Sequence, residues 1–413
     1  VSALRAIGRA RANYLASTPS PLLDERYKNF SWLFLKSAEE TWGEKGLCEP
    51  PKPSDGSDWC SNAVFNASAA CHPLQSASWM EQRAWSLEKP VEALGSHPLA
   101  SIIGSELAQL RTSSPPDLTG LAPVPGSAWS DVRCGMHSPR VGFNHLGAMT
   151  VLGSLQGDLL SFGYQTFSSE ELTKVADAYY PGDGPEYFTS TCGNTSKSAI
   201  TFPRLRAMWS TAENHTGVCR IVLQIDLPSN VTVDYGAPAQ LWADIFVEGS
   251  TKGDASLNAS LILLNKTTTR QKESAFVSFA PSAQVAEPKT MEFHKVSTWV
   301  SPLEVAMFGS RHIHYVSDKG VRWGGSVGEA SGQGELTVRS LDAGLLAVGD
   351  PRPVPVPGDA LPNVSQGVAF NLWNNLWNTN YIFWYPYGVP GDENLKFRFG
   401  MSWHPKQPSS LIV

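Results

Sequence analysis

The chain has little charge and no long apolar run. Only 17% of its 413 residues are charged, and the net charge is −6. This mild negative charge indicates neither nucleic acid nor an anionic membrane surface as a partner. No apolar run reaches the length of a membrane-spanning helix. We therefore expect no nucleic acid and no membrane among the partners.

Motifs for several kinds of chemistry are also missing. There is no GxxxxGK loop or GxGxxG after a strand to cradle a phosphate. The six cysteines have no CxxC spacing, so they predict structural disulfides rather than zinc or redox chemistry. They are Cys48, Cys60, Cys71, Cys134, Cys192 and Cys219. With the cysteines paired, we expect no nucleophilic catalysis.

Asparagines, in contrast, are concentrated in Asn-x-Ser/Thr sequons. Eight of the 17 lie in one, and we predict glycosylation at seven: Asn66, Asn194, Asn214, Asn230, Asn258, Asn265 and Asn363. The eighth, Asn29, abuts a helix start and is the doubtful acceptor. Sequons and cysteines together predict a secreted glycoprotein of the cell wall or of a vacuolar or lysosomal lumen.

Residues 1–112 predict a helical bundle that contains a disulfide-rich loop. Apolar residues recur on one helical face to about Leu15, and further helices are expected over Glu25–Trp42, from near Ser78 and after Pro98. Pro90 should kink or interrupt the third helix. The chain opens in a helical pattern without Met or a signal peptide, so we expect proteolytic processing or a fragment.

The pattern changes to a period of two from about Val132. Residues 113–131 are rich in Ser and Pro and predict a linker. Many short strands with frequent turn residues predict antiparallel sandwich architecture. The strands are Val218–Leu227, Leu241–Val247, Ala259–Leu264, Ala275–Phe279 and Glu335–Leu341. The fold class is therefore multidomain α+β, with a β-sandwich at 132–350 that residues 351–413 complete.

Residues 367–386 combine aromatic side chains with asparagines. Flat apolar rings and paired amide donors and acceptors suit the binding of sugar rings. We predict a substrate-binding surface made of Trp373, Asn375, Trp377, Asn380 and Trp384. The alternative is a last pair of strands that closes the sandwich, and physics alone favours it.

Other polar groups have a plain structural interpretation. His312 and His314 fall on one strand face at a spacing compatible with a metal, but hydrogen-bonded histidines on a half-buried strand are favoured. His137 and His145 are isolated. The charged segment Asn265–Arg270 with Glu273 predicts a surface salt bridge.

A resemblance rests on a series of segments in a shared order. They are Phe30–Gly43, Trp79–Arg83, Val91–Gly95, Gly147–Met149, Phe162–Phe167, Asp234–Pro238, Asn265–Arg270, Trp299–Pro302, Gly309–His314, Ser340–Asp342 and the aromatic ending. The series spans nearly the whole chain. It resembles a family of large proteins related to glycoside hydrolase family 38, the α-mannosidases.

The resemblance implies a β/α catalytic barrel, a three-helix bundle and then mannosidase-like or galactose-mutarotase-like β-sandwich domains. It also implies zinc in the complete protein, with two carboxylates for retaining hydrolysis. The present chain would begin after the barrel and would not hold zinc alone. The family carries Glu-His-Thr-Trp-Gly where this chain has Glu39-Glu40-Thr-Trp-Gly43, so Glu40 is the one metal candidate and a weaker ligand.

Three hypotheses follow. The first is a barrel-buttressing, C-terminal part of a secreted α-mannosidase-like glycosidase, whose catalytic barrel lies on a missing or separate polypeptide. Its partners would be the catalytic-barrel fragment as a separate chain, N-linked glycans and carbohydrate. The second is a non-catalytic structural or carbohydrate-binding glycoprotein. The third is an independent lyase or hydrolase with a site built from Arg311–His314 and Glu273.

Overall fold

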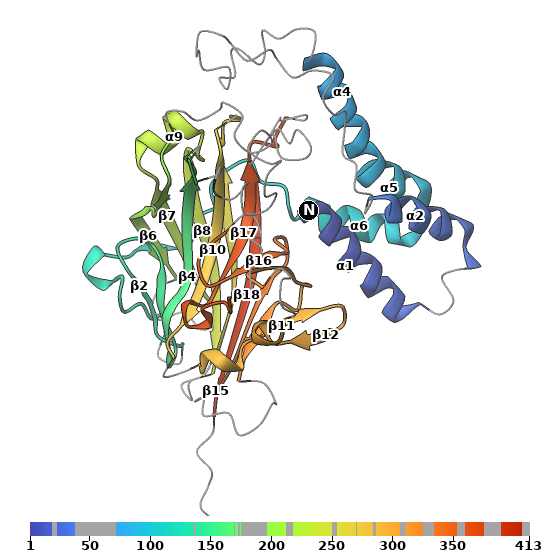
Figure 1. Ribbon diagram of the computed structural model, residues 1–413. Helices are drawn as coiled ribbons and strands as arrows, with labels where there is room; N and C mark the ends of the chain where they lie inside the picture. Colours follow the sequence, from blue (N-terminus) through green and yellow to red (C-terminus); the bar gives the residue numbers. More distant parts are fainter. Residues whose placement is uncertain are drawn as a thin grey trace, which may run out of the picture.

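The structure is a computed structural model of the chain. It describes residues 1–18, 23–37, 72–135, 138–168, 170, 171, 174, 196–211, 218–249, 254–269, 271–283, 286–305, 311–324, 334–352, 360–375 and 390–406. A helical body lies beside a two-layered β-sandwich (Figure 1). This confirms the predicted α+β class.

The helical body has its own small core. Its helices are α1 (Ser2–Ser17), α2 (Glu25–Lys36), α4 (His72–Arg83), α5 (Lys89–Leu94) and α6 (Pro98–Ala108). Their apolar faces meet in a cluster of fully buried residues: Ile7, Ala10, Tyr27, Phe30, Leu94, Leu99 and Ile103. The periodicity therefore located these helices, although α2 ends before the predicted Trp42 and α4 begins before the predicted Ser78.

Pro90 interrupts the third helical region as expected. Residues Ala84–Glu88 form a π-helical turn, and Pro90 then sits in the first turn of α5. Proline has no N–H to give to the preceding turn, and its ring clashes with the carbonyl four residues earlier. The wider π-turn accommodates both effects.

Two antiparallel sheets make the sandwich. The larger runs in the order β1 (Ala122–Pro123), β6 (Arg204–Ser210), β7 (Cys219–Asp226), β8 (Gln240–Gly249), β9 (Ala255–Leu264), β18 (Leu395–Pro405), β15 (Gly334–Ser340), β14 (Val321–Trp323), β11 (Glu292–Lys295) and β12 (Thr298–Val300). The smaller runs in the order β13 (Ile313–Tyr315), β16 (Leu345–Val348), β17 (Val368–Asn375), β10 (Glu273–Pro281), β4 (Leu155–Thr166), β3 (Met149–Leu152) and β2 (Val141–Phe143), while β5 (Ala199–Thr201) also pairs with β4. A short helix, α9 (Ser229–Tyr235), lies between β7 and β8 in the chain.

The main core lies between the sheets, and β7 shows why the sequence alternates there. Ile221, Leu223 and Ile225 are buried in the inner cluster. Val222 on the opposite face is buried too, because Leu118 and Leu121 cover it together with two tryptophans. Residues 113–131, predicted as a linker, therefore contribute to an outer cluster and supply the edge strand β1.

The last two long strands do not form a pair. β17 lies between β16 and β10 in the smaller sheet, and β18 lies between β9 and β15 in the larger one. These strands therefore complete the sandwich as predicted, but they do not pair with each other, because each belongs to a different sheet. The disulfide Cys134–Cys219 ties the start of β7 to the segment before β2. The other four cysteines lie outside the described ranges.

Arg5 on α1 joins the helical body to the sandwich. Its guanidinium donates hydrogen bonds to the carbonyl oxygens of Val316 (2.9 Å), Ser340 (2.7 Å) and Leu341 (3.1 Å), although Arg5 is only 8% exposed. A Cβ atom on Gly344 would lie 2.7 Å from Arg5 Nη1, so the sandwich leaves room for this side chain. The guanidinium thus supplies donors to three carbonyls that strand pairing does not satisfy.

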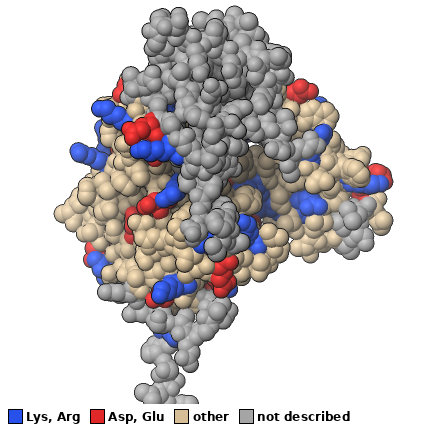
Figure 2. Space-filling view, in the orientation of Figure 1, with Lys and Arg blue, Asp and Glu red and all other residues tan. Residues whose placement is uncertain are grey.

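Asp342 extends the joint. Its fully buried carboxylate accepts from Arg398 Nε and Nη2 at 2.9 Å each and lies 3.4 Å from Arg9 Nη2 on α1. Arg398 Nη1 in turn donates to Gln109 Oε1 at 2.6 Å, just beyond α6. Figure 2 shows Lys and Arg side chains along the recess between the two bodies. The two bodies are therefore held together through buried polar contacts.

Replacing Arg5 should loosen this joint. We expect Arg5→Met to lower the free energy of unfolding by about 3 kcal/mol, because the carbonyls of Val316 and Ser340 lose their charged donor while that of Leu341 keeps Arg9. Urea titration followed by circular dichroism measures the change. The matched control is Arg206→Met, which breaks only the exposed Arg206–Asp226 ion pair and should change stability by less than about 0.5 kcal/mol. Equal effects of the two substitutions would contradict the assigned role of Arg5.

Candidate functional site

The described part of the predicted sugar surface is internal. Trp373 is 7% exposed and stacks on Phe397 with ring centroids 6.5 Å apart. Asn375 is 2% exposed, and its amide donates to the carbonyls of Thr269 (2.6 Å) and Gln271 (3.1 Å). Trp377, Asn380 and Trp384 lie outside the described residues. The contacts of Trp373 and Asn375 are thus structural, and sugar binding by this set stays a prediction.

Beside Trp373 lies a buried ionic group that the sequence did not lead us to expect. Lys266 Nζ is 2.5 Å from Glu273 Oε1, and both side chains are fully buried. Tyr164 donates a hydrogen bond to Glu273 Oε2, and Lys266 lies 5.6 Å from the centroid of the Trp373 ring. The prediction of a surface salt bridge was therefore wrong. We call Lys266, Glu273, Tyr164 and Trp373 the end cluster.

The end cluster forms because four elements end together. Lys266 follows β9 and Glu273 begins β10, while Tyr164 and Trp373 lie near the ends of β4 and β17. Strand register places Tyr164 and Trp373 on either side of Ala275. From the sequence, alternation on β10 predicts only that Glu273 shares a face with Ala275. Charged residues after a strand normally indicate a solvated loop, so the burial of Lys266 and Glu273 could not be predicted.

Lys272 is a second buried cation at this end of the sandwich. It is 1% exposed, and burial lowers the pKa of its ammonium group to about 8. Removal from water disfavours the charged form of a lysine, which explains the direction of the shift. Lysines with lowered pKa values occur in functional sites as well as in structural networks.

The histidine segment is structural. His314 is 2% exposed, its Nε2 lies 3.0 Å from the Arg311 carbonyl oxygen, and its ring stacks on Phe293. Burial lowers the pKa of the His314 imidazole, so the ring is neutral at pH 7. His145 is exposed, and His137 lies outside the described ranges.

A site shared by Arg311–His314 and Glu273 is excluded by the sheet register. His314 pairs through Leu346 and Phe370 with Val277, which lies four residues along β10 from Glu273. Three strand spacings and four residue rises separate the two groups by roughly 20 Å. The third hypothesis is therefore wrong.

Metal and nucleophile candidates are few in the described part of the chain. Its residues contain no group of three or more His, Cys, Asp or Glu side chains that could hold a metal ion. Glu40 lies outside it. Residues 324–328 read Gly-Gly-Ser-Val-Gly, which matches the GxSxG motif of serine nucleophiles. The prediction of no nucleophilic catalysis did not take this match into account. The match follows β14, which has antiparallel neighbours rather than the parallel strands of an α/β-hydrolase.

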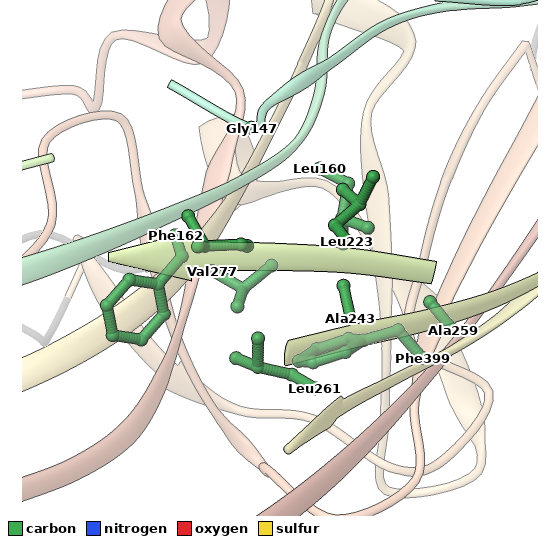
Figure 3. A pocket seen from close by; sticks show the side chains of 10 residues that line it. Gly147, Leu160, Phe162, Leu223, Ala243, Ala259, Leu261, Val277 and Phe399 are labelled. Carbon is green, nitrogen blue, oxygen red and sulfur yellow. The ribbon is translucent and has the colours of Figure 1, made fainter. Parts of the chain in front are cut away.

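A small cavity lies between the two sheets. It measures about 30 Å³ and is lined by glycine and apolar side chains, among them Leu223, Ala243 and Val277 (Figure 3). No polar side chain lines it to orient a sugar or hold a water molecule. It is therefore a packing defect of the core.

The sequons within the described ranges lie on the surface. Asn230, Asn258, Asn265 and Asn363 are exposed, and so is Asn29 on α2. Asn66, Asn194 and Asn214 lie outside those ranges. No helix in the described segments is long and apolar enough to span a membrane.

Neither a protein-family model nor a curated protein matches the chain. The relation to the α-mannosidases and the secreted location therefore stay predictions. The fold class rests on the structure alone.

Filling the cavity should stabilise the core. We expect Ala243→Val to raise the free energy of unfolding by about 0.5–1 kcal/mol, since its added methyl groups enter empty space. Ala275→Val is the matched control: Ala275 is fully buried away from the cavity and should lose about 1–3 kcal/mol through overpacking. Urea titrations compare both with the wild type, and a destabilised Ala243→Val variant would show that the cavity cannot take a larger side chain.

The lowered pKa of Lys272 predicts a pH dependence of stability. Between pH 8 and 10.5 the unfolded chain binds more protons at this residue than the folded chain does, so the contribution of Lys272 to stability rises with pH. Relative to Lys272→Met, the wild type should gain up to about 3 kcal/mol over this range. Paired urea titrations at pH 7.5, 8.5 and 9.5 measure the difference, and a difference independent of pH would contradict the assignment.

Proposed function

We propose that this chain is the helical and β-sandwich part of an α-mannosidase-like glycoside hydrolase, and that it buttresses a catalytic barrel on another polypeptide. The observation that carries the proposal is an exposed apolar surface on α2. Trp32 is 72% exposed and Leu35 73% exposed, while Leu23, just before the helix, is 85% exposed. We call these three residues the α2 surface. Isolated exposed apolar side chains are common, but a tryptophan and a leucine exposed on one helix face are typical of an interface.

The geometry of the helical body supports this use of the α2 surface. Trp32 and Leu35 are three residues apart, so they share one face of the helix. The opposite face carries Tyr27 and Phe30 into the core. Figure 1 shows α2 on the side of the helical body away from the sandwich. A partner on this side would meet the helices without displacing the joint at Arg5.

The chemistry in this proposal belongs to the partner. The described residues gather no metal-binding group, so they do not fit zinc, and no step is assigned to them. Glu40 follows α2 closely in sequence, and it is the one residue of this chain that the resemblance connects with the metal. The role of the chain is then to hold the barrel in place.

A second candidate is a carbohydrate-binding glycoprotein without catalysis. The observation that favours it is a short amide row at the end of β17: exposed Asn374 donates to Asn371 Oδ1 at 3.2 Å. Paired amides can donate to and accept from sugar hydroxyl groups. Binding on a glycan array without hydrolysis by the native assembly distinguishes this candidate from the first.

Disrupting the α2 surface should release the partner. We expect the double variant Trp32→Asp, Leu35→Asp to co-purify with at most one tenth of the partner polypeptide that the wild type retains. The reason is that two charges would enter an apolar interface. The partner is identified by hydrolysis of aryl α-mannosides. Val233→Asp on α9 is the matched control, since Val233 is 79% exposed on the sandwich side and should leave binding unchanged.

Glycan mapping of the same material gives an independent check. Asn29 lies three residues before Trp32 on α2, so a glycan there would crowd the docked partner. We expect Asn29 to be unmodified while exposed Asn230, Asn258 and Asn363 carry glycans. A fully occupied Asn29, or a native protein that purifies alone, would count against the barrel partner.

A further inference from the structure

Lys266 and Glu273 flank the connection between β9 and β10. Their Nζ and Oε1 atoms are 2.5 Å apart, and neither side chain is exposed. Removing two charges from water is costly unless their contact is good and every polar atom has a hydrogen bond. The geometry of this pair should therefore be that of a well-formed salt bridge.

Glu273 Oε1 does not meet this condition. Within the described structure it is a buried oxygen without a hydrogen bond, even though the lysine nitrogen is in contact with it. Lys266 Nζ donates instead to the carbonyl oxygens of Gly236 and Thr267, at 3.3 Å each. Buried carboxylate oxygens without a hydrogen bond are rare and call for a specific explanation.

We propose that Lys266 and Glu273 condense after folding to form an intramolecular amide bond between Nζ and Cδ. Oε1 is then the oxygen that leaves as water. The bond removes both buried charges and the oxygen that lacks a hydrogen bond. It does not depend on the proposed function.

The reaction needs no other reactant. A proton first passes from the Lys266 ammonium to the Glu273 carboxylate, which gives an amine with a free lone pair and a carboxylic acid. The nitrogen lone pair attacks Cδ, and the C=O electrons move to Oε2, which accepts the Tyr164 hydroxyl hydrogen bond. The Cδ–Oε1 bond then breaks. Oε1 departs as water with two of the three ammonium hydrogens, and the third stays on the amide nitrogen.

The surroundings of the pair favour formation of the amide over its hydrolysis. Trp373 and Tyr164 enclose the pair, and Tyr164 itself is fully buried, so little water reaches the bond to hydrolyse it. The fold holds nitrogen and carboxyl together, and such intramolecular arrangements reach effective concentrations of about 10⁵ M or more. Proximity of this kind moves an unfavourable condensation toward the amide.

Peptide mass spectrometry tests the bond directly on the wild-type protein. Trypsin cuts after Arg270 and Lys272, so Lys266 and Glu273 normally fall in different peptides. After removal of N-glycans, reduction and digestion, we expect residues 253–270 joined to residues 273–289, with a mass lower than their sum by one water. Fragmentation should place the link at Lys266 and Glu273.

Single substitutions test the roles of Lys266 and Tyr164 in forming the amide bond. Lys266→Met should lose the linked species, and Tyr164→Phe should reduce it at least tenfold because the oxygen that gains charge loses its donor. Lys272→Met is the control: it removes a neighbouring buried lysine and should leave the link in place. A wild-type digest in which trypsin cuts after Lys266 and residues 273–289 appear alone overturns the proposal, whatever the variants do.

Discussion

The Arg5 guanidinium fixes how the two bodies of this protein sit relative to each other. It is buried and donates to the carbonyl oxygens of Val316, Ser340 and Leu341. These carbonyls lie at the ends of strands, where pairing no longer satisfies them. A polar joint of this kind is directional, whereas an apolar contact tolerates sliding. The orientation of the α2 surface, on which the proposed function rests, therefore depends on these directional contacts of α1, together with those of Arg9 to Asp342.

The sequence predicted the parts of the fold that follow a regular period. Cys219–Asp226 alternates, and its odd positions lie in the inner core as expected. It did not predict that Val222 on the other face is covered as well. That cover comes from Leu118 and Leu121, in a segment whose Ser and Pro content indicated a linker. Local composition cannot report a contact made about a hundred residues further along the chain.

The candidate site also could not be predicted from local composition. Aromatic rings and amides have the same composition whether they face a sugar or a loop, and Asn375 donates to loop carbonyls. Lys266 and Glu273 were expected on the surface because a charged segment after a strand is normally solvated. Nothing in the spacing of those two residues distinguishes a surface pair from a buried one. Their burial depends on where four strands from both halves of the sandwich end.

Burial of polar residues at that end has a physical reason in the backbone. The connections there leave carbonyl oxygens inside the protein, and side chains supply the missing donors. Asn375 donates to Thr269 and Gln271, and Lys266 donates to Gly236 and Thr267. Apolar replacements would fill the space but leave these oxygens without partners, at about 1–3 kcal/mol each. The nitrogen of Lys266 thus has a structural use even as an amide, because its one remaining N–H can still donate to one of the two carbonyls.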